Sequence, residues 1–462
     1  MYCIPGIIGL IIFTYVRPQE FVPAIAGIPW INMWLLMILG GFVYDMMSGR
    51  LRKERTPHLP FALIFYVWCF VTLGLKNPAQ TMQPFAFLTT CIGLSMIMQH
   101  AIQNVKTFLR IVTVVFTTSM FCVSVAFHQG LQDFQCVIVT FDPEAMDLPP
   151  MLEPDGRPCE RKGECAEGPG GDEEKEYWCE HVGLFGTTSI STGRVRWRGV
   201  LMDPNETTLA AGQSVPFAFA FYETKRTLLR LLIVLATVIV VVITDVFSQS
   251  RGSILIFMTV MAVYFVRKYG IRGMLVGGGM AAPLMMLGGR GGEEAKQSAE
   301  ERMEVMSDGL NMFIGNPAFG VGYGQFVQHS FLTAHNAYVL AAAELGLFGF
   351  WIWTIIVYLV MKTMILALQR YKNVPGGELI RAWALGLFAS FCGTLVGIFF
   401  LSWTYHYVLW IYFGIAGGFY TMVRTTDRGF RVTLSKLELG GLSVFCVGFI
   451  IMLKIYLKSK GH

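Results

Sequence analysis

The chain has 462 residues, of which 54% are hydrophobic and only 15% charged, with a formal net charge of +5 at pH 7. Soluble globular domains carry about a quarter of their residues as charged side chains. This composition excludes an ordinary soluble protein and indicates a chain that lies mostly in a lipid bilayer.

Apolar segments long enough to cross a bilayer recur along the chain and predict about thirteen crossings, in a range of roughly twelve to fourteen. They fall near Ile4–Tyr15, Met33–Met47, Pro60–Leu75, Phe85–His100, Phe108–Phe127, Thr207–Tyr222, Leu228–Phe247, Ile254–Val266, Met274–Leu287, Ala337–Leu366, Ala382–Ser402, Val408–Met422 and Leu439–Leu457. The sequence therefore predicts an all-α polytopic membrane protein. The first apolar segment lacks a basic region and a small-residue cleavage site, so we expect it to remain as a membrane anchor.

Lysine and arginine gather after the even-numbered crossings. The basic loops are Gly49–Arg55, Glu223–Arg230, Val266–Arg272, Gln369–Lys372 and Val423–Arg431. Basic residues near the ends of membrane spans stay in the cytoplasm, so the amino terminus is expected there. Thirteen crossings would leave the basic carboxyl terminus outside, which the same rule disfavours.

The first large outer loop spans residues 130–204. Between Asp142 and Glu180 it holds 13 Asp or Glu residues against 4 Lys or Arg residues. Its four cysteines are Cys136, Cys159, Cys165 and Cys179. An even number of cysteines on an oxidising side of the membrane favours two disulfides. A zinc site and a calcium site are the alternatives, although neither the cysteine nor the acid spacing is typical of them.

The second large outer loop spans residues 288–335. Its first part carries apolar side chains at helical spacing, namely Met303, Met306, Leu310 and Phe313. This pattern predicts an amphipathic helix that lies on the membrane surface or over a cavity. A turn with glycines at positions 315, 320, 322 and 324 follows, where the backbone can approach a ligand or another helix closely.

These features divide the chain into five parts. They are the N-terminal transmembrane helices (1–129), an outer acidic insertion with cysteines (130–204), further transmembrane helices (205–287), an outer loop with an amphipathic helix (288–335) and the C-terminal transmembrane helices (336–462). No glycine-rich phosphate loop with its lysine follows a strand, so nothing indicates ATP hydrolysis or a cofactor.

Arginines recur at the outer ends of the crossings, where the positive-inside rule disfavours them. They are Arg194, Arg196, Arg198, Arg251, Arg290 and Arg302. A guanidinium grips phosphate at two points and stays charged at any working pH. His335, at the start of the tenth crossing, titrates near neutrality and can take a proton from a hydroxyl. Together these groups suit a diphosphate held at the membrane surface.

Each of these residues also has a structural explanation. The arginines could pair with the acidic insertion, with neighbouring glutamates or with lipid headgroups. His335 could cap its helix beside Asn336. Glu344, within the same apolar segment, could pair with an arginine or hydrogen-bond a neighbouring helix.

Five motifs then follow one another in the order seen in the O-antigen ligase/polymerase superfamily, from about Trp197 to Gly349. They are RWRGVLMDPNETTLA, SQSRGS, AEERMEV, NPAFGVGYGQF and HNAYVLAAAELGLFG. The chain therefore resembles a metal-independent glycosyltransferase with a GT-C-like helical bundle. Its opening IIFTYVRPQEFVPAI is also similar to relatives encoded with exosortase systems or exopolysaccharide clusters. The cysteine-bearing insertion and a thirteenth span lie outside the usual pattern of the family.

The resemblance implies roles for single residues. His335 becomes the general base, and Arg251 becomes the first choice for binding diphosphate. Arg198 is the second choice, with Arg196 as its competitor, and Arg302 matches the arginine that opens the second loop. Supporting positions are Asn336 and Glu344.

The function implied by the resemblance is transfer of a glycan from an undecaprenyl diphosphate carrier to an acceptor hydroxyl, with inversion and without metal or cofactor. The acceptor would be lipid A core, another glycan or a protein, and membrane lipid would be the other partner, with no nucleic acid. The expected location is the inner membrane of a bacterium, with the active site facing the periplasm. A repeat-unit polymerase of the same superfamily and, from another class, a flippase of lipid-linked sugars remain alternatives.

Overall fold

A computed structural model describes residues 1–52, 54–79, 82–140, 151–172, 174–191, 193–273, 275 and 293–461. Within this part of the chain, eight helices are long and apolar enough to cross a membrane. They are α2 (Trp30–Met47), α3 (Leu59–Lys76), α5 (Val105–Gln129), α8 (Leu228–Phe247), α9 (Arg251–Tyr269), α12 (Ala337–Arg370), α13 (Glu378–Gly397) and α15 (Lys436–Lys460). The chain is thus a polytopic all-α membrane protein, as its composition predicts.

Five further helices of the described residues belong to the bundle. They are α1 (Cys3–Tyr15), α4 (Met82–Ala101), α7 (Pro204–Thr224), α11 (Glu293–Gly315) and α14 (Tyr407–Thr426). The short 3₁₀ helices are η1 (Pro18–Glu20), η2 (Pro23–Ile25), η3 (Leu184–Gly186), η4 (Gly199–Leu201), η5 (Phe326–Gln328) and η6 (Trp403–Tyr405). Every predicted crossing except the ninth coincides with a helix, and the ninth, Met274–Leu287, lies outside the described residues apart from Leu275.

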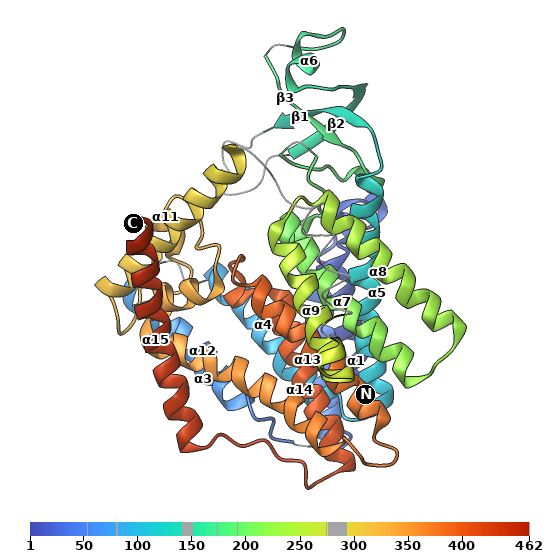
Figure 1. Cartoon of the computed structure of the whole chain (residues 1–462), viewed down its shortest axis with the longest axis vertical. Helices are drawn as coiled ribbons and strands as arrows, with labels where there is room; N and C mark the ends of the chain where they lie inside the picture. Colours follow the sequence, from blue (N-terminus) through green and yellow to red (C-terminus); the bar gives the residue numbers. More distant parts are fainter. Residues whose placement is uncertain are drawn as a thin grey trace.

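The insertion is a small disulfide-linked sheet that stands beyond one end of the helical bundle (Figure 1). Strands β1 (Phe134–Thr140), β2 (Met151–Pro158) and β3 (Glu176–His181) pair antiparallel in the order β2-β1-β3, with the short helix α6 (Lys162–Glu167) beside them. Disulfides join Cys136 to Cys165 and Cys159 to Cys179. These bonds hold together a segment that is too acidic and too small to form a large apolar core.

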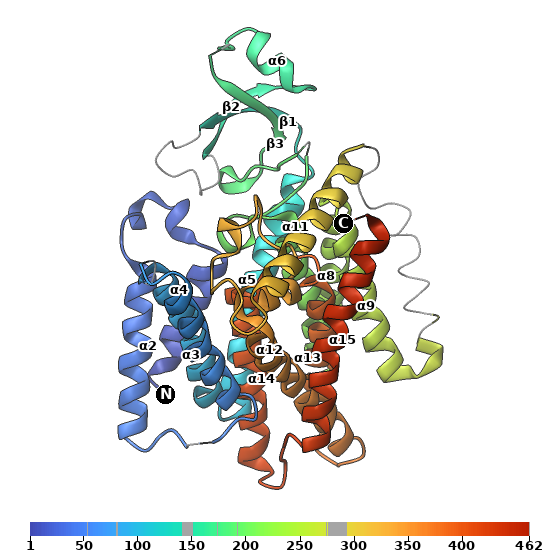
Figure 2. The same cartoon turned by 90° about the vertical axis from the view of Figure 1, so that its left-hand side faces the viewer.

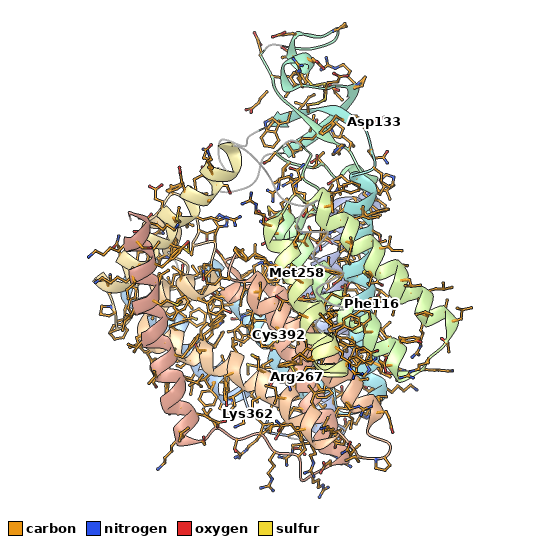
Figure 3. All side chains as sticks on the ribbon, in the orientation of Figure 1. Phe116, Asp133, Met258, Arg267, Lys362 and Cys392 are labelled. Carbon is orange, nitrogen blue, oxygen red and sulfur yellow. A yellow bond between two sulfur atoms is a disulfide. The ribbon has the colours of Figure 1, made fainter. Side chains whose placement is uncertain are left out.

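The two ends of the bundle differ. We call the end that carries the sheet the insertion end. The amino terminus lies toward the opposite end, and the carboxyl terminus lies at the insertion end beside α11, in both views (Figures 1 and 2). This arrangement is the one that an odd number of crossings requires. Arg267 and Lys362, near two basic loops, lie toward the opposite end from Asp133 at the base of the insertion (Figure 3).

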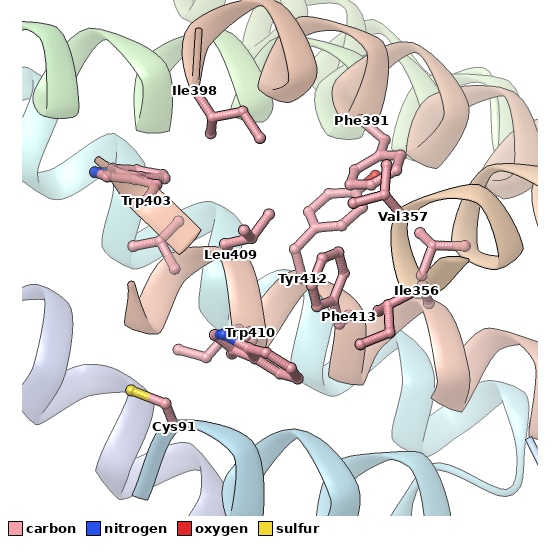
Figure 4. Close-up of a cluster of buried hydrophobic side chains, with 14 of the residues drawn as sticks. Cys91, Ile356, Val357, Phe391, Ile398, Trp403, Leu409, Trp410, Tyr412 and Phe413 are labelled. Atoms are coloured by element: carbon pink, nitrogen blue, oxygen red, sulfur yellow. The ribbon is translucent and has the colours of Figure 1, made fainter. Parts of the chain in front are cut away.

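Apolar side chains of α13 and α14 fill the centre of the bundle. Figure 4 shows Phe391, Tyr412 and Trp410 there, between α12 and the α4 residue Cys91. The rings of Phe391 and Tyr412 stack at 5.3 Å. Because lipid is as apolar as these side chains, their packing stabilises the bundle mainly through van der Waals contact.

The long helix α12 is interrupted at Gly346, whose φ of +66° and ψ of −171° are not helical. The glycine-rich turn after α11 fits against this break. Three backbone hydrogen bonds of 2.8 to 3.0 Å join them, from Val321 to Ala343, from Gly322 to Glu344 and from Leu347 to Pro317. The turn thus satisfies backbone groups that the interrupted helix exposes, as the interior of a membrane protein demands.

We expect Gly346→Ala to destabilise the protein by about 1–3 kcal/mol, because an added Cβ would strain the positive φ. The same Cβ would lie 2.5 Å from the backbone carbon and oxygen of Ala318. Thermal unfolding of detergent-purified protein measures the effect. Gly448→Ala on α15 is the matched control, since a Cβ there meets nothing within 4 Å. Equal unfolding temperatures for both variants would contradict the tight fit.

Candidate active site

A cavity of about 810 Å³ lies between α9, α11, α15 and the carboxyl end of α13. Its polar lining is Arg194, Asn205, Gln249, Ser250, Arg251, Ser298, Arg302, His335, Tyr456 and Lys460. Its apolar lining includes Leu255, Met303, Met306, Phe399, Phe400, Phe449, Met452 and Leu453. Since α9 begins at Arg251 and runs toward Arg267 near the opposite end, the cavity lies toward the insertion end (Figure 3).

Arg251 is the first residue of α9. The N-cap of this helix is Ser250, whose hydroxyl accepts a hydrogen bond from the Ser253 backbone N–H at 3.2 Å. Gln249, just before it, has a left-handed φ of 51° that turns the chain sharply into the helix. The amino end of α9 therefore faces the cavity, and its helix dipole adds to the positive charge of Arg251.

Arg194 stands near the carboxyl end of the insertion and lines the same cavity as Arg251. Its Nε donates to the backbone oxygen of Ser248 at 3.0 Å, and the residue is only 6% exposed. Glu180 of β3 accepts hydrogen bonds from the Ser189 hydroxyl at 2.6 Å and the Gly193 N–H at 3.0 Å. The insertion thus fixes the turn that carries a cationic group of the cavity.

His335 lies directly before α12 with a left-handed φ of +45°. The adjacent Ala337 N–H donates to the Ile398 carbonyl at 2.9 Å, which ties this position to the end of α13. Asn336, not His335, caps the helix, because its side chain accepts from the N–H groups of Tyr338 and Val339 at 2.9 and 3.1 Å. A non-glycine residue held at positive φ is costly and is concentrated at functional sites.

Two opposed influences act on the imidazole of His335. Burial, and then the positive charge of Arg302, lower the pKa of His335 below its usual value, while the carboxylates of Asp203 and Glu301 act to raise it. The net shift is downward, so the ring is neutral at pH 7. A neutral imidazole can accept a proton.

Arg302 comes from α11, the helix that the sequence predicts to be amphipathic. Met303 and Met306 of this helix line the cavity, while Leu310 and Phe313 are buried. The helix therefore covers the cavity with one face and brings Arg302 to its rim.

Arg196 and Arg198 do not line this cavity. Arg196 donates to the carbonyl of Thr188 at 3.1 Å and that of Met202 at 3.3 Å, and burial lowers its pKa to about 10. Arg198 donates to the Phe185 carbonyl at 2.5 Å and lies over the ring of Phe21, 5.7 Å from its centre. The structure thus brings together Arg251, Arg302 and His335, and leaves these two arginines apart from them.

Glu344 is buried in α12, on the side of the glycine-rich turn. Its Oε1 accepts the Phe326 backbone N–H at 3.0 Å, so it holds that turn against the helix. Asp203 caps α7 and accepts the Asn205 N–H at 2.7 Å. Asn205 itself reaches the cavity.

Sequence reasoning did not single out two cations of the cavity. Arg194 was one of three alternating arginines with no feature that separates it from the others. Lys460 stands in the last turn of α15, after the five motifs. Its signal is that thirteen predicted crossings leave the basic carboxyl terminus on the side that the positive-inside rule disfavours.

The arrangement has a clear chemical character. Four cationic side chains and a helix amino terminus surround one space with a neutral histidine, and among the described residues no Asp or Glu lines it. Such a cavity can hold an anion such as a diphosphate and can accept a proton. The described residues contain one group of three or more candidate metal ligands, Cys136, Cys159 and Cys165, and all three are in disulfides.

The comparison with models of protein families agrees with the five motifs found between Trp197 and Gly349. Residues 208–354 match the model of the O-antigen ligase family, Wzy_C. This segment contains Arg251, Arg302, His335 and Glu344. No curated protein matches the chain. This match to an O-antigen ligase model supports the likeness of the chain to the O-antigen ligase/polymerase superfamily.

Proposed function

We propose that the protein is a glycosyltransferase that moves a glycan from undecaprenyl diphosphate to the hydroxyl of an acceptor. The observation that carries the proposal is the convergence of His335 with Arg194, Arg251 and Arg302 on one cavity. The family match supports the same class of reaction.

The arginines bind and stabilise the leaving group. As the bond between the anomeric carbon and the diphosphate oxygen breaks, that oxygen takes the electron pair and negative charge grows on the diphosphate. Guanidinium groups fixed around it stabilise this charge without rearranging. The amino end of α9 contributes in the same direction.

His335 activates the acceptor. Its neutral ring takes the proton of the hydroxyl while the oxygen forms the new bond to the anomeric carbon. A retaining enzyme would need a carboxylate nucleophile, and among the described residues no carboxylate lines the cavity. One base opposite one anion site supports a single displacement with inversion. The proton then passes from His335 to solvent.

The apolar wall suits a lipid-linked donor. Phe399, Phe449, Met452 and Leu453 line the cavity together with the cations. A polyprenyl chain can lie against these side chains while its diphosphate meets the arginines at headgroup depth. No cofactor is required, because the diphosphate is already a good leaving group.

We place the insertion end in the periplasm. Disulfides form in oxidising compartments, and the insertion holds two of them. The basic loops near Arg267 and Lys362 lie toward the opposite end, where the positive-inside rule expects the cytoplasm. The active site would then face the periplasm of a bacterial inner membrane.

Purified protein in detergent, given an undecaprenyl diphosphate glycan and candidate acceptors, tests the proposal. Release of undecaprenyl diphosphate together with a glycosylated acceptor, without any membrane gradient, is the expected result. Movement of donor across vesicle membranes with no chemical transfer would instead identify a flippase. Transfer of a single glycan would indicate a ligase, and a ladder of products a polymerase.

A further inference from the structure

The last helix, α15, forms one wall of the candidate site although it lies outside the matched domain. Phe449, Met452, Leu453, Tyr456 and Lys460 all line the cavity. Their spacing of three and four residues puts them on one face of a helix. The remaining faces carry exposed apolar side chains such as Val444, Ile451 and Ile455, as expected of a helix at the lipid boundary. The helix therefore separates the cavity from the membrane.

Contacts with α12 fix where α15 stands. Near its start, Glu438 accepts a hydrogen bond from the Tyr358 hydroxyl at 2.5 Å and forms an ion pair with Lys362. Higher up, the ring of Phe449 lies 5.6 Å from that of Phe350 and 5.8 Å from that of Tyr338. Beyond Phe449 the helix continues along the cavity toward α11, which brings its last turn to the cavity rim.

Two opposed tendencies bear on the positive charge of that last turn. A helix ends with a partial negative charge, which would repel an anionic ligand from the cavity rim. Lysines are also disfavoured on the outer side of a membrane. Lys458 and Lys460 both offset the helix dipole, yet only Lys460 lines the cavity. Stabilisation of the helix end alone therefore does not account for the position of Lys460.

We propose that Lys460 is a further substrate-binding residue, whose ammonium group binds a phosphate oxygen of the lipid-linked diphosphate. This inference rests on the proposed function. The flexible stem of Lys460 can lie along the apolar wall while its charged end stays at headgroup depth. The diphosphate is then bound from two sides of the cavity, by Arg194 and Arg251 near α9 and by Lys460 on α15.

Lys460→Gln tests the inference, with Lys458→Gln as the matched control. Both changes remove one charge from the same exposed turn, so their effects on folding should be alike. We expect Lys460→Gln to raise the KM for the donor and the Kd for undecaprenyl diphosphate by about 3- to 10-fold, as for the loss of one charge-assisted hydrogen bond at a half-open site. The value of kcat should change little, Lys460→Arg should restore binding, and Lys458→Gln should behave like the wild type.

Several results separate this inference from the proposed function. Equal donor KM and Kd values for the two glutamine variants, in a wild type that binds and transfers, would overturn the role of Lys460 alone. A wild type that neither binds undecaprenyl diphosphate nor transfers a glycan would overturn the proposed function itself. Loss of bound phosphatidylglycerol in Lys460→Gln nanodiscs, with unchanged undecaprenyl diphosphate binding, would show that Lys460 holds an ordinary lipid and would overturn the inference.

Discussion

Replacing His335 by asparagine should lower kcat for glycan transfer by about 10²- to 10⁴-fold, the usual contribution of a general base. Asparagine tolerates a left-handed backbone, so it should keep the φ of +45° found at this position. It cannot take a proton from the acceptor hydroxyl at neutral pH. Single-turnover transfer by purified protein measures the loss.

Two further measurements keep this expectation specific. Undecaprenyl diphosphate should bind to His335→Asn with nearly the wild-type Kd, because the arginines remain in place. Thermal unfolding should also change little. A variant that retains more than a tenth of the wild-type kcat would show that another group removes the proton.

The pH profile of the wild type follows from the state of the same ring. Burial and the charge of Arg302 lower the pKa of His335, so the neutral base persists below the usual titration range of histidine near pH 6.5. Activity should fall only as the pH drops through this lowered pKa. Arg302→Gln removes one of the two causes, so the acidic limb of its profile should move to higher pH. An unmoved limb would mean that His335 does not set it.

The amino-acid sequence predicts the helices well because few backbone structures can cross a bilayer. A segment that crosses lipid must be both apolar and helical, so α3, α8 and α13 can be read from composition alone. The break of α12 at Gly346 is different. A glycine permits many conformations, and only the contact with the turn at residues 317–322 selects the one that is adopted.

The residues of the candidate site also divide into those that the sequence predicts and those that only tertiary contacts select. Arg251, Arg302 and His335 follow from motifs whose order carries information. Arg194, Arg196 and Arg198 alternate along an extended segment, so all three project toward the same side in a sequence-based prediction. The choice among them is made by tertiary contacts, since Glu180 fixes the turn before Arg194 and Ser248 accepts from its guanidinium. Such contacts between distant segments are not encoded in local spacing.

The second large expected effect concerns Arg251, which lines the cavity, whereas Arg198 does not. Arg251→Gln should lower kcat/KM for transfer by about 10²- to 10³-fold, the range seen when one fixed donor to a developing negative charge is removed. Arg251→Lys should recover part of the activity, since lysine supplies the charge but not the two-point grip on phosphate. The readout is release of undecaprenyl diphosphate over a range of donor concentrations.

Arg198→Gln is the matched control for this experiment. It removes the same group from the same end of the bundle, but Arg198 lies against Phe21 and the Phe185 carbonyl and does not line the cavity. We therefore expect kcat/KM to fall by less than about fivefold, in line with the small effect of a change at a partly exposed position away from the reacting groups. A loss in Arg198→Gln as large as that in Arg251→Gln, with both proteins folded, would move the diphosphate away from the cavity between α9 and α15. The arginine that binds the leaving group would then be Arg198, just before η4. The acceptor hydroxyl would have to approach the anomeric carbon from the side of His335.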